Sequence, residues 1–205
     1  MARVKQRLIE TAIEKFGKHG LDGASTRDIA AAADTAMSSI TYHFGGKEGL
    51  YQAAAEHIFS HLRNLLSDPP IELPPEGAPD SERVDVICTM LGRVARFMLQ
   101  DKSAAFSLFI AREQQLPSEL VRELMRNHME NTMSRLAGQV ALLRPDMDQT
   151  DVRATTLFLF GMAVTLRHSR TALHLLLEAD EIDDAMKQRL VSRLDQIIRA
   201  VLKES

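Results

Sequence analysis

The chain has 205 residues, of which 45% are hydrophobic and 26% are charged, and its formal net charge is −3. This composition is ordinary for a globular protein that can bury a sizeable core, and the charge excludes a broadly basic nucleic-acid-binding surface. The single cysteine, Cys88, excludes an internal disulfide framework. No apolar run reaches the roughly 18 residues of a membrane span, and residues 1–8 lack the apolar core of a signal peptide. We therefore expect a cytoplasmic protein with no membrane partner.

The first predicted element is an amphipathic helix over residues 4–16. Its apolar side chains recur at helical spacing, at Leu8, Ile9, Ala12, Ile13 and Phe16. Gly17 and Gly20 follow, and glycine commonly ends a helix.

Residues 25–51, STRDIAAAADTAMSSITYHFGGKEGLY, indicate two short helices, a tight turn and the start of a longer helix. Ser25 or Thr26 can cap the first helix, because a hydroxyl there accepts a hydrogen bond from an unpaired backbone N–H. Small apolar residues on that helix allow a second helix, over residues 37–44, to cross at close range. Ile40 and Phe44 face inward from this second helix. The arrangement is typical of a helix-turn-helix, whose second helix lies in the DNA major groove.

The outward side of the second helix carries hydroxyl, phenol and imidazole groups, which suit base edges and phosphates. Lys47 begins the next helix, where the helix dipole disfavours a cation unless a phosphate lies opposite. Each residue taken singly also fits a solvated surface position, but the order of the elements favours DNA contacts. The predicted contacts are Thr26, Arg27, Met37, Ser38, Ser39, Thr41, Tyr42, His43 and Lys47.

These segments resemble the TetR/AcrR family of transcriptional regulators. The similar motifs are F-G-x-x-G at Phe16–Gly20, S-T-x-x-x-I-A at Ser25–Ala30, and I-T-Y-H-F-G-G-K-E-G-L-Y at Ile40–Tyr51. The I-T-Y-x-F-G-x-K-E form and the later Arg112-Glu113-Gln114 look most like the CecR-like branch. The turn departs from the family pattern, because Asp34 and Thr35 replace the usual glycine and apolar residue and Ala36 replaces a usual capping residue.

The rest of the chain predicts helices and no strands. Five of the seven prolines lie in residues 68–80, DPPIELPPEGAPD, which we predict to be a loop. Residues 168–182 give no readable pattern. Helical periodicity covers about residues 47–67, 81–100, 103–115, 117–143, 149–168 and 183–202. We predict an all-α protein with a three-helix helix-turn-helix DNA-binding domain over residues 1–48 and a helical ligand-binding and dimerisation domain over residues 49–205.

Two of the later helices indicate self-association. Residues 157–166, LFLFGMAVTL, are apolar on all sides, and such a helix must be covered on every face. The last helix also repeats apolar residues along its length. A two-fold dimer in which both helices join a four-helix bundle would cover them. The predicted interface residues are Phe160, Val164, Leu190, Leu194, Ile197, Ile198 and Val201.

A regulatory cavity is predicted among the helices over residues 81–100, 103–115, 117–143 and 149–168. Flexible methionines on several of these helices suit an adaptable apolar pocket, although an ordinary filled core is the alternative. The predicted walls are Met98, Phe109, Met125, Met129 and Phe158, and the polar candidates are Arg112, His128 and Arg167. Two cations favour an anionic or carbonyl-bearing ligand. The alternative for Arg112 and Glu113 is an ion pair on the surface.

No sequence pattern indicates catalysis, a cofactor or a bound metal. His57 and His61 have the i, i+4 spacing of metal ligands, but the glutamate of the zinc-protease motif is missing. Cys88 lies on an apolar helix face, where a thiol usually acts as a small hydrophobe, with a redox sensor as the alternative.

The sequence therefore indicates a DNA-binding regulator and not an enzyme. The resemblance implies a homodimer on a palindromic double-stranded operator, acting as a repressor that an unidentified small-molecule inducer releases. Transcriptional activation is one alternative. A helical adaptor for protein partners, with an incidental DNA-binding module, is another.

Overall fold

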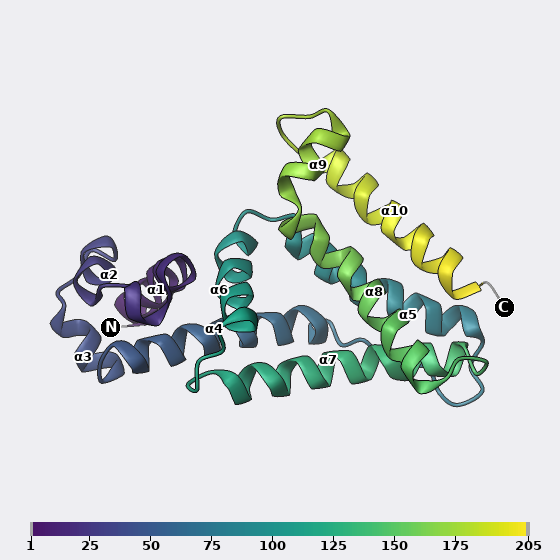
Figure 1. Ribbon diagram of the computed structural model, residues 1–205, viewed down its shortest axis with the longest axis horizontal. Helices are drawn as coiled ribbons and strands as arrows, with labels where there is room; N and C mark the ends of the chain where they lie inside the picture. Colours follow the sequence, from purple (N-terminus) through teal and green to yellow (C-terminus); the bar gives the residue numbers. More distant parts are fainter. Residues whose placement is uncertain (1, 204–205) are drawn as a thin grey trace. The chain divides into compact units, whose positions relative to one another are not determined.

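The computed structural model of the protein describes residues 2–203, in which ten helices and no strand occur (Figure 1). The prediction of an all-α protein is confirmed. The helices are α1 (Ala2–Gly23), α2 (Thr26–Ala32), α3 (Ser38–Phe44), α4 (Lys47–Ser67), α5 (Asp80–Met98), α6 (Ser103–Gln115), α7 (Arg122–Leu143), α8 (Gln149–His168), α9 (Arg170–Leu177) and α10 (Asp184–Lys203).

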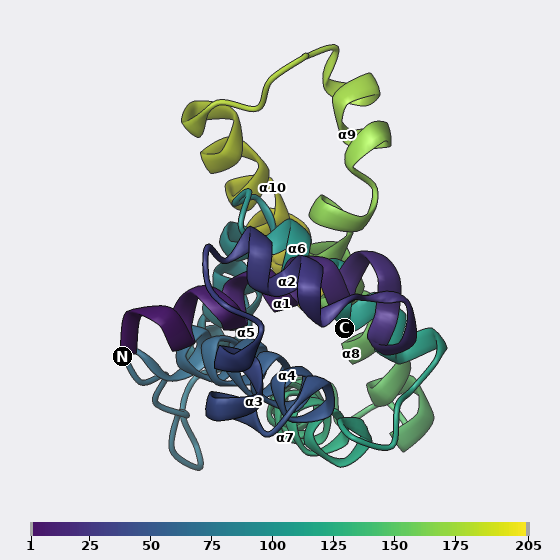
Figure 2. The same cartoon turned by 90° about the vertical axis from the view of Figure 1, so that its left-hand side faces the viewer.

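Three segments differ from the predicted helices. The first helix, predicted over residues 4–16, continues through Gly17 to Gly23 in α1, with helical geometry interrupted at Gly20 (φ 72°). The helix predicted from Pro117 begins only at Arg122, because the Glu113 carboxylate accepts hydrogen bonds from the backbone N–H and hydroxyl of Ser118 and holds the chain in a turn. The unreadable segment contains α9, which ends at Glu178 in a left-handed conformation (φ 50°). Figure 2 shows α9 continuing from the end of α8 before a loop leads back into α10.

The chain forms two compact units. The first unit contains the residues up to Arg63 together with Ala104–His128, and the second contains Asn64–Ser103 together with the chain from Met129 onward. The predicted boundary between residues 48 and 49 falls inside the first unit, since α4 continues there without a break. Residues 104–128, which carry most of α6 and the start of α7, thus belong with the helix-turn-helix.

The core of the first unit gathers the predicted apolar faces of α1, α2, α3 and α4. Ile40 is the buried anchor of α3, with 1% of its surface exposed. Phe109 of α6 joins the same core, although it is far from the others in sequence. The remaining large members are Leu8, Ile13, Phe16, Ile29, Leu50, Tyr51, Ile58 and Phe59.

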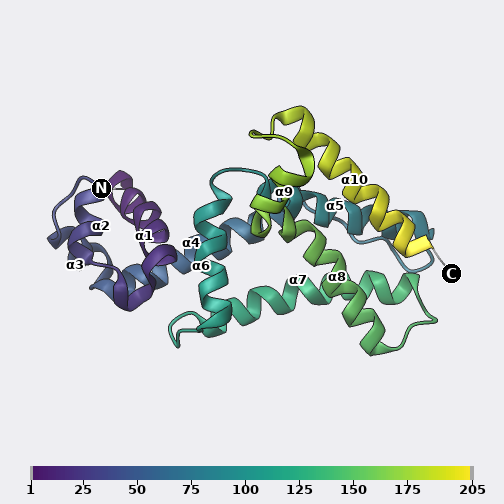
Figure 3. The same ribbon diagram turned by 45° about the horizontal axis from the view of Figure 1, so that its top comes forward.

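The second unit is organised around α5, which packs against both α8 and α10 (Figure 3). Its apolar stripe, including Ile87, Leu91 and Ala95, is fully buried. The predicted proline-rich loop lies between Ser67 and Asp80. Three arginines donate hydrogen bonds to its backbone carbonyls: Arg83 to Pro75, Arg93 to Pro69 and Arg135 to Ile71.

The junction between α3 and α4 requires a glycine. A Cβ atom on Gly49 would lie 1.9 Å from the carbonyl oxygen of Phe44, the last residue of α3. Because the obstacle is backbone, no side-chain rotation can relieve the clash. The absence of a side chain at Gly49 therefore fixes how closely α3 can approach the first turn of α4.

Gly49→Ala is expected to lower the free energy of unfolding by about 1–3 kcal/mol, the usual cost of overpacking. Gly138→Ala is the matched control, because a Cβ at this α7 glycine meets no atom within 4 Å. That change should raise stability by up to about 1 kcal/mol, since alanine favours helix. Urea unfolding followed by circular dichroism measures both. Equal effects of the two substitutions would contradict the close approach at Gly49.

Candidate nucleic-acid interface

The turn between α2 and α3 is built from local hydrogen bonds. The Ser25 hydroxyl accepts a hydrogen bond from the backbone N–H of Asp28 at 3.3 Å, which confirms Ser25 as the cap of α2. Asp34 takes a left-handed conformation (φ 48°), which aspartate tolerates better than most residues. This explains how Asp34 replaces the family's usual glycine. Met37 precedes α3 without a side-chain cap.

Ser39 differs from its neighbours on α3, because its hydroxyl has a partner inside the protein. It lies 3.0 Å from the hydroxyl of Thr35, and the side chain is half-buried. This hydrogen bond joins the turn to the first residues of α3. Ser39 therefore helps to hold α3 against the turn, a role that the sequence pattern did not reveal.

The exposed face of α3 is formed by Met37, Ser38, Thr41 and Tyr42. Tyr42 is 71% exposed and Met37 is 56% exposed. Large side chains this accessible have little packing role in the single chain. Beside them, the half-buried ring of His43 makes an edge contact with that of Tyr42, with centroids 4.9 Å apart. The face presents hydroxyls and one thioether over the buried anchor Ile40, which suits contacts with base edges.

Basic residues lie around this face as separate groups. Arg27 is exposed on α2. The ammonium of Lys47 donates a hydrogen bond to the carbonyl of Asp22 at 3.1 Å, near the C-terminal end of α1. Arg7 donates to the carbonyl of Asp34 at 3.2 Å and also forms a 3.6 Å ion pair with that residue's carboxylate. Arg7 therefore stabilises the turn between α2 and α3. Lys47 is bound through one carbonyl, a partner that it can exchange for a phosphate oxygen.

α6 supports the helix-turn-helix by a close approach to α1. A Cβ atom on Gly17 would lie 3.3 Å from the Ala105 carbonyl oxygen and 3.3 Å from the Phe109 nitrogen. The guanidinium of Arg112 donates hydrogen bonds to the carbonyls of Gly17 at 3.4 Å and Lys18 at 3.2 Å. Carbonyls near the end of a helix lack intrahelical partners, and a cation is favoured there.

Gly20 completes this contact. It has φ 72°, which interrupts the helical geometry of α1, and a Cβ atom there would lie 2.9 Å from a terminal nitrogen of Arg112. The F-G-x-x-G motif thus supplies two positions where α6 can approach α1 closely. Arg112 was predicted to face a ligand or to form a surface ion pair with Glu113, and the structure instead places it on the α1 carbonyls.

Glu113 forms a second buried contact between segments. The carboxylate is 2% exposed and accepts hydrogen bonds from the Tyr51 hydroxyl and from the Ser118 hydroxyl and N–H. Burial and the nearby Glu113 raise the pKa of Tyr51, so this phenol stays a hydrogen-bond donor. The Tyr51 ring packs on Phe16 and Phe109, with centroids 4.8 and 4.9 Å apart. Together these groups join α1, α4 and α6.

The residues predicted to line a ligand cavity are divided between the two units. In the first unit, Phe109 is core, Met125 packs against that core, and His128 lies 5.2 Å from the ring of Phe59. Burial, reinforced by the charge of Arg63, lowers the pKa of His128. Arg112 binds the α1 carbonyls as described.

In the second unit, Met98 is buried. Phe158 was predicted to line the cavity, but its side chain is 71% exposed on α8. Arg167 donates hydrogen bonds to the Met98 carbonyl at 3.0 Å and the Ser103 hydroxyl at 2.8 Å. It therefore occupies the C-terminal end of α5, much as Arg112 binds the carbonyls that precede the break in α1 at Gly20. Met129 begins the portion of α7 that belongs to this unit.

The histidine pair of α4 has an apolar neighbour. The rings of His57 and His61 both meet Phe106 edge-on, with centroids 6.1 and 5.4 Å away. Within residues 2–203, no group of three or more His, Cys, Asp or Glu side chains could hold a metal ion. No helix in that range is long and apolar enough to cross a membrane.

Comparisons with known proteins match both parts of the chain. Residues 8–54 match the family of bacterial regulatory proteins named tetR, and residues 81–204 match the C-terminal domain of the HTH-type transcriptional dual regulator CecR. CecR of Shigella flexneri is 27% identical over 99% of this chain and 95% of its own length. The negative transcriptional regulator IcaR of the biofilm operon in Staphylococcus aureus is 32% identical over 63 residues, which are 31% of this chain and 34% of IcaR.

A solved structure has the same fold. AibR, crystallised with isovaleryl coenzyme A and operator DNA, has a TM-score of 0.70 and 14% identity, with 95% of this chain and 97% of AibR covered. A supported α2–turn–α3 element with an exposed α3 face defines the class of helix-turn-helix transcriptional regulators. The chain belongs to the TetR family of these regulators, in the CecR-like branch. The resemblance seen in the sequence is confirmed, and the protein is a transcriptional regulator and not an enzyme.

Arg112→Met is expected to lower the free energy of unfolding by about 1–3 kcal/mol, because the α1 carbonyls lose hydrogen bonds to a charged donor. Arg122→Met removes the same charge from the start of α7, where Arg122 forms only an exposed ion pair with Glu119. That control should change stability by less than about 1 kcal/mol. Urea unfolding of the two variants side by side measures the difference. If Arg112→Met were no more harmful than Arg122→Met, the contact with α1 would not support the unit.

Proposed function

We propose that the protein is a repressor that binds a palindromic operator as a homodimer and is released by a small molecule. The exposed face of α3, held on buried Ile40, carries the DNA-binding part of this proposal. Two such helices, related by two-fold symmetry, would enter successive major grooves about 34–36 Å apart. The name of IcaR supports repression, whereas CecR is named a dual regulator, so activation at some promoters is the second candidate.

The groups around α3 divide into base-reading and phosphate-binding residues. Thr41 and Tyr42 are exposed near the middle of α3 and would contact base edges, with Met37, Ser38 and His43 beside them. Thr26 and Arg27 on α2 would bind phosphates. Lys47 would exchange the carbonyl of Asp22 for a phosphate oxygen. Ser39 would act indirectly, because its hydroxyl already binds Thr35.

The dimer interface is proposed on the outer sides of α8 and α10. Leu157 and Phe158 are 61% and 71% exposed on α8, and Val201 is 39% exposed on α10. Exposed apolar groups this large favour burial by a partner. Phe160, Val164, Leu190 and Ile197 are half-buried on the same two helices and would complete the contact.

Two predicted interface residues are placed differently. Leu194 and Ile198 are only 6% and 0% exposed in the single chain, on the side of α10 that lines a groove with α5. They need no second subunit to cover them, because α10 packs on α5 within the same unit. Apolar periodicity alone did not distinguish the side of α10 facing α5 from the side facing outward. We therefore leave these two residues out of the proposed interface.

Release by a small molecule rests on a coupling between ligand and DNA. AibR was crystallised with both an acyl coenzyme A and operator DNA. In the present chain, α4 and α7 are continuous helices that each begin in the first unit and end in the second. A ligand that binds better when α4 is displaced would also displace the end of α3, because Phe44 of α3 packs closely on Gly49 of α4. Such a coupling typically amounts to about 1–3 kcal/mol.

Tyr42→Ala is expected to weaken binding to the DNA upstream of the protein's own gene by about 1–3 kcal/mol, with little effect on random DNA, because the ring contacts base edges. Arg27→Ala should weaken binding to both DNAs and reduce the salt slope by about one. Fluorescence anisotropy at several salt concentrations measures both variants. A wild-type protein with no preference for the upstream DNA would favour the adaptor alternative. Equal losses for both variants on both DNAs would contradict the division of roles.

Phe158→Glu is expected to give a folded monomer, because this exposed side chain contributes to the dimer and not to the core of its own chain. Leu194→Glu is expected to unfold the protein, since it places an unpaired charge in a buried position. Sedimentation velocity and circular dichroism distinguish these outcomes. A Phe158→Glu protein that sediments as a wild-type dimer would move the interface away from this face of α8.

A further inference from the structure

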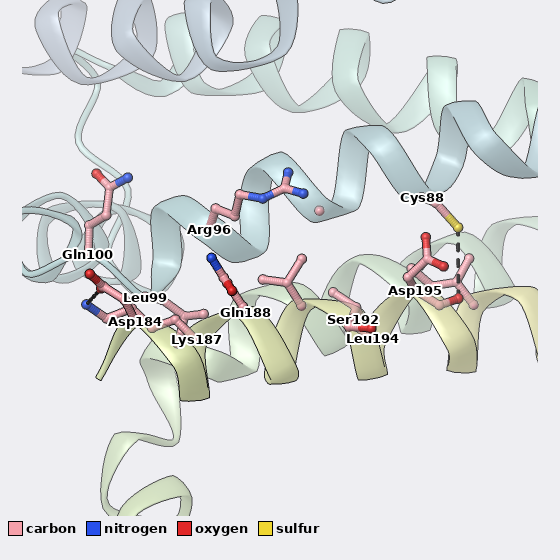
Figure 4. A pocket seen from close by; sticks show the side chains of 13 residues that line it. Cys88, Arg96, Leu99, Gln100, Asp184, Lys187, Gln188, Ser192, Leu194 and Asp195 are labelled. Carbon is pink, nitrogen blue, oxygen red and sulfur yellow. Dashed lines mark hydrogen bonds and ion pairs between the residues drawn. The ribbon is translucent and has the colours of Figure 1, made fainter. Parts of the chain in front are cut away.

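A groove with a volume of about 540 Å³ runs between α5 and α10 in the second unit (Figure 4). This volume lies within the range of small-molecule sites. Cys88, Gly92, Arg96 and Gln100 line it from the α5 side at intervals of four residues, so they follow one face of that segment. The opposite wall is α10, with Val191, Leu194 and Ile198 as its apolar members. The groove shares no lining residue with the cavity predicted from the sequence.

Each carboxylate that lines the groove forms an ion pair with a cation of the protein. Asp184 forms a 3.0 Å ion pair with Lys187. Asp195 forms a 2.8 Å ion pair with Arg199, which also binds Asp85 at 2.7 Å. These pairs leave little negative charge to attract a cationic ligand.

Arg96 is the charged group of the groove that has no partner in the described part of the chain. Within residues 2–203 its guanidinium has no hydrogen bond or ion pair. The side chain extends along α5 toward Gly92, where a Cβ atom would lie 3.5 Å from one terminal nitrogen of Arg96 and 3.9 Å from the other. The absence of a side chain at Gly92 therefore leaves the guanidinium room beside the groove. An unpaired guanidinium fits a carboxylate, which it can bind through two parallel hydrogen bonds.

The rest of the groove suits an apolar chain. Leu99, Leu194 and Ile198 are buried and form its floor together with Val191. From Arg96 to Cys88 the helix rises by about 12 Å, at about 1.5 Å per residue. At the Cys88 end, burial and the neighbouring Asp195 raise the pKa of the thiol to about 12, so that end of the groove carries a neutral thiol.

We propose that this groove binds a small amphipathic carboxylate of medium chain length. The carboxylate would pair with Arg96, and the alkyl chain would lie on the floor toward Cys88. The amides of Gln100 and Gln188, which also line the groove, are available to the polar end of the ligand. The proposal does not depend on DNA binding or on repression, because a binding measurement on the free protein tests it.

Octanoate is the probe, and 1-octanol is its neutral counterpart. Octanoate should bind the full-length protein, and 1-octanol should bind at least tenfold more weakly. In protein with labelled leucine and valine methyl groups, octanoate should shift the NMR signals of Leu99, Val191 and Leu194. Titration calorimetry supplies the affinities.

Arg96→Met should weaken octanoate binding at least tenfold, to the level of 1-octanol. The side chain is exposed and has no partner among the described residues, so this variant should fold like the wild type. Arg122→Met, which removes the same charge from the other unit, should leave octanoate binding unchanged. The proposal is overturned if octanoate fails to bind, if Arg96→Met binds it as well as wild type, or if the shifted methyl groups lie only outside the groove.

Discussion

The contact of α6 with α1 is the constraint on which the DNA-binding unit depends. At Gly17 the two backbones approach so closely that even a methyl group would press against Ala105 and Phe109. Arg112 then binds the carbonyls of α1, and the neighbouring Glu113 binds Tyr51 of α4. Two adjacent residues of α6 thus hold both of the long helices that frame the helix-turn-helix. The recognition face of α3 therefore depends on a contact between α1 and a residue that lies 94 and 95 positions further along the chain than its two partners.

Several arginines of this protein serve as internal hydrogen-bond donors. Arg112 binds carbonyls before the break in α1 at Gly20, and Arg167 binds one at the end of α5. Arg83, Arg93 and Arg135 bind the carbonyls of the proline-rich loop. Guanidinium groups suit this work because each offers several donors in a fixed plane. The formal net charge is −3, and these five arginines bind carbonyls of their own units and are not part of the exposed face of α3. Only a few cations, such as Arg27 and Lys47, are left beside the exposed face of α3.

The sequence predicted those features that depend on local interactions. The described helices other than α9, the proline-rich loop, the Ser25 cap and the buried anchor Ile40 follow from periodicity, capping and turn chemistry within a few residues. The family was also readable, because its motifs lie in one continuous stretch.

The features that were missed depend on which distant segments meet. Nothing near Arg112 in the sequence indicates that its partners are carbonyls of residues 17 and 18. The glycines of F-G-x-x-G were a signal, since two glycines four positions or fewer apart at a helix end often mark a close approach. The same reason explains why the sequence did not predict the burial of Leu194 or the exposure of Phe158. Both are apolar residues on helices, and the packing of α10 and α8 on α5 decides which of them is covered in the single chain.

Native-state hydrogen exchange of the full-length protein tests the central role of the α1–α6 contact most directly. In low concentrations of denaturant, backbone amides in the second half of α1, the first half of α4 and α6 should open together with a single free energy. The account predicts that these three segments form one cooperative group, separate from α5, α8 and α10. If the amides of α6 instead opened together with those of α5 and α8, independently of α1, the proposed support of the helix-turn-helix would be wrong.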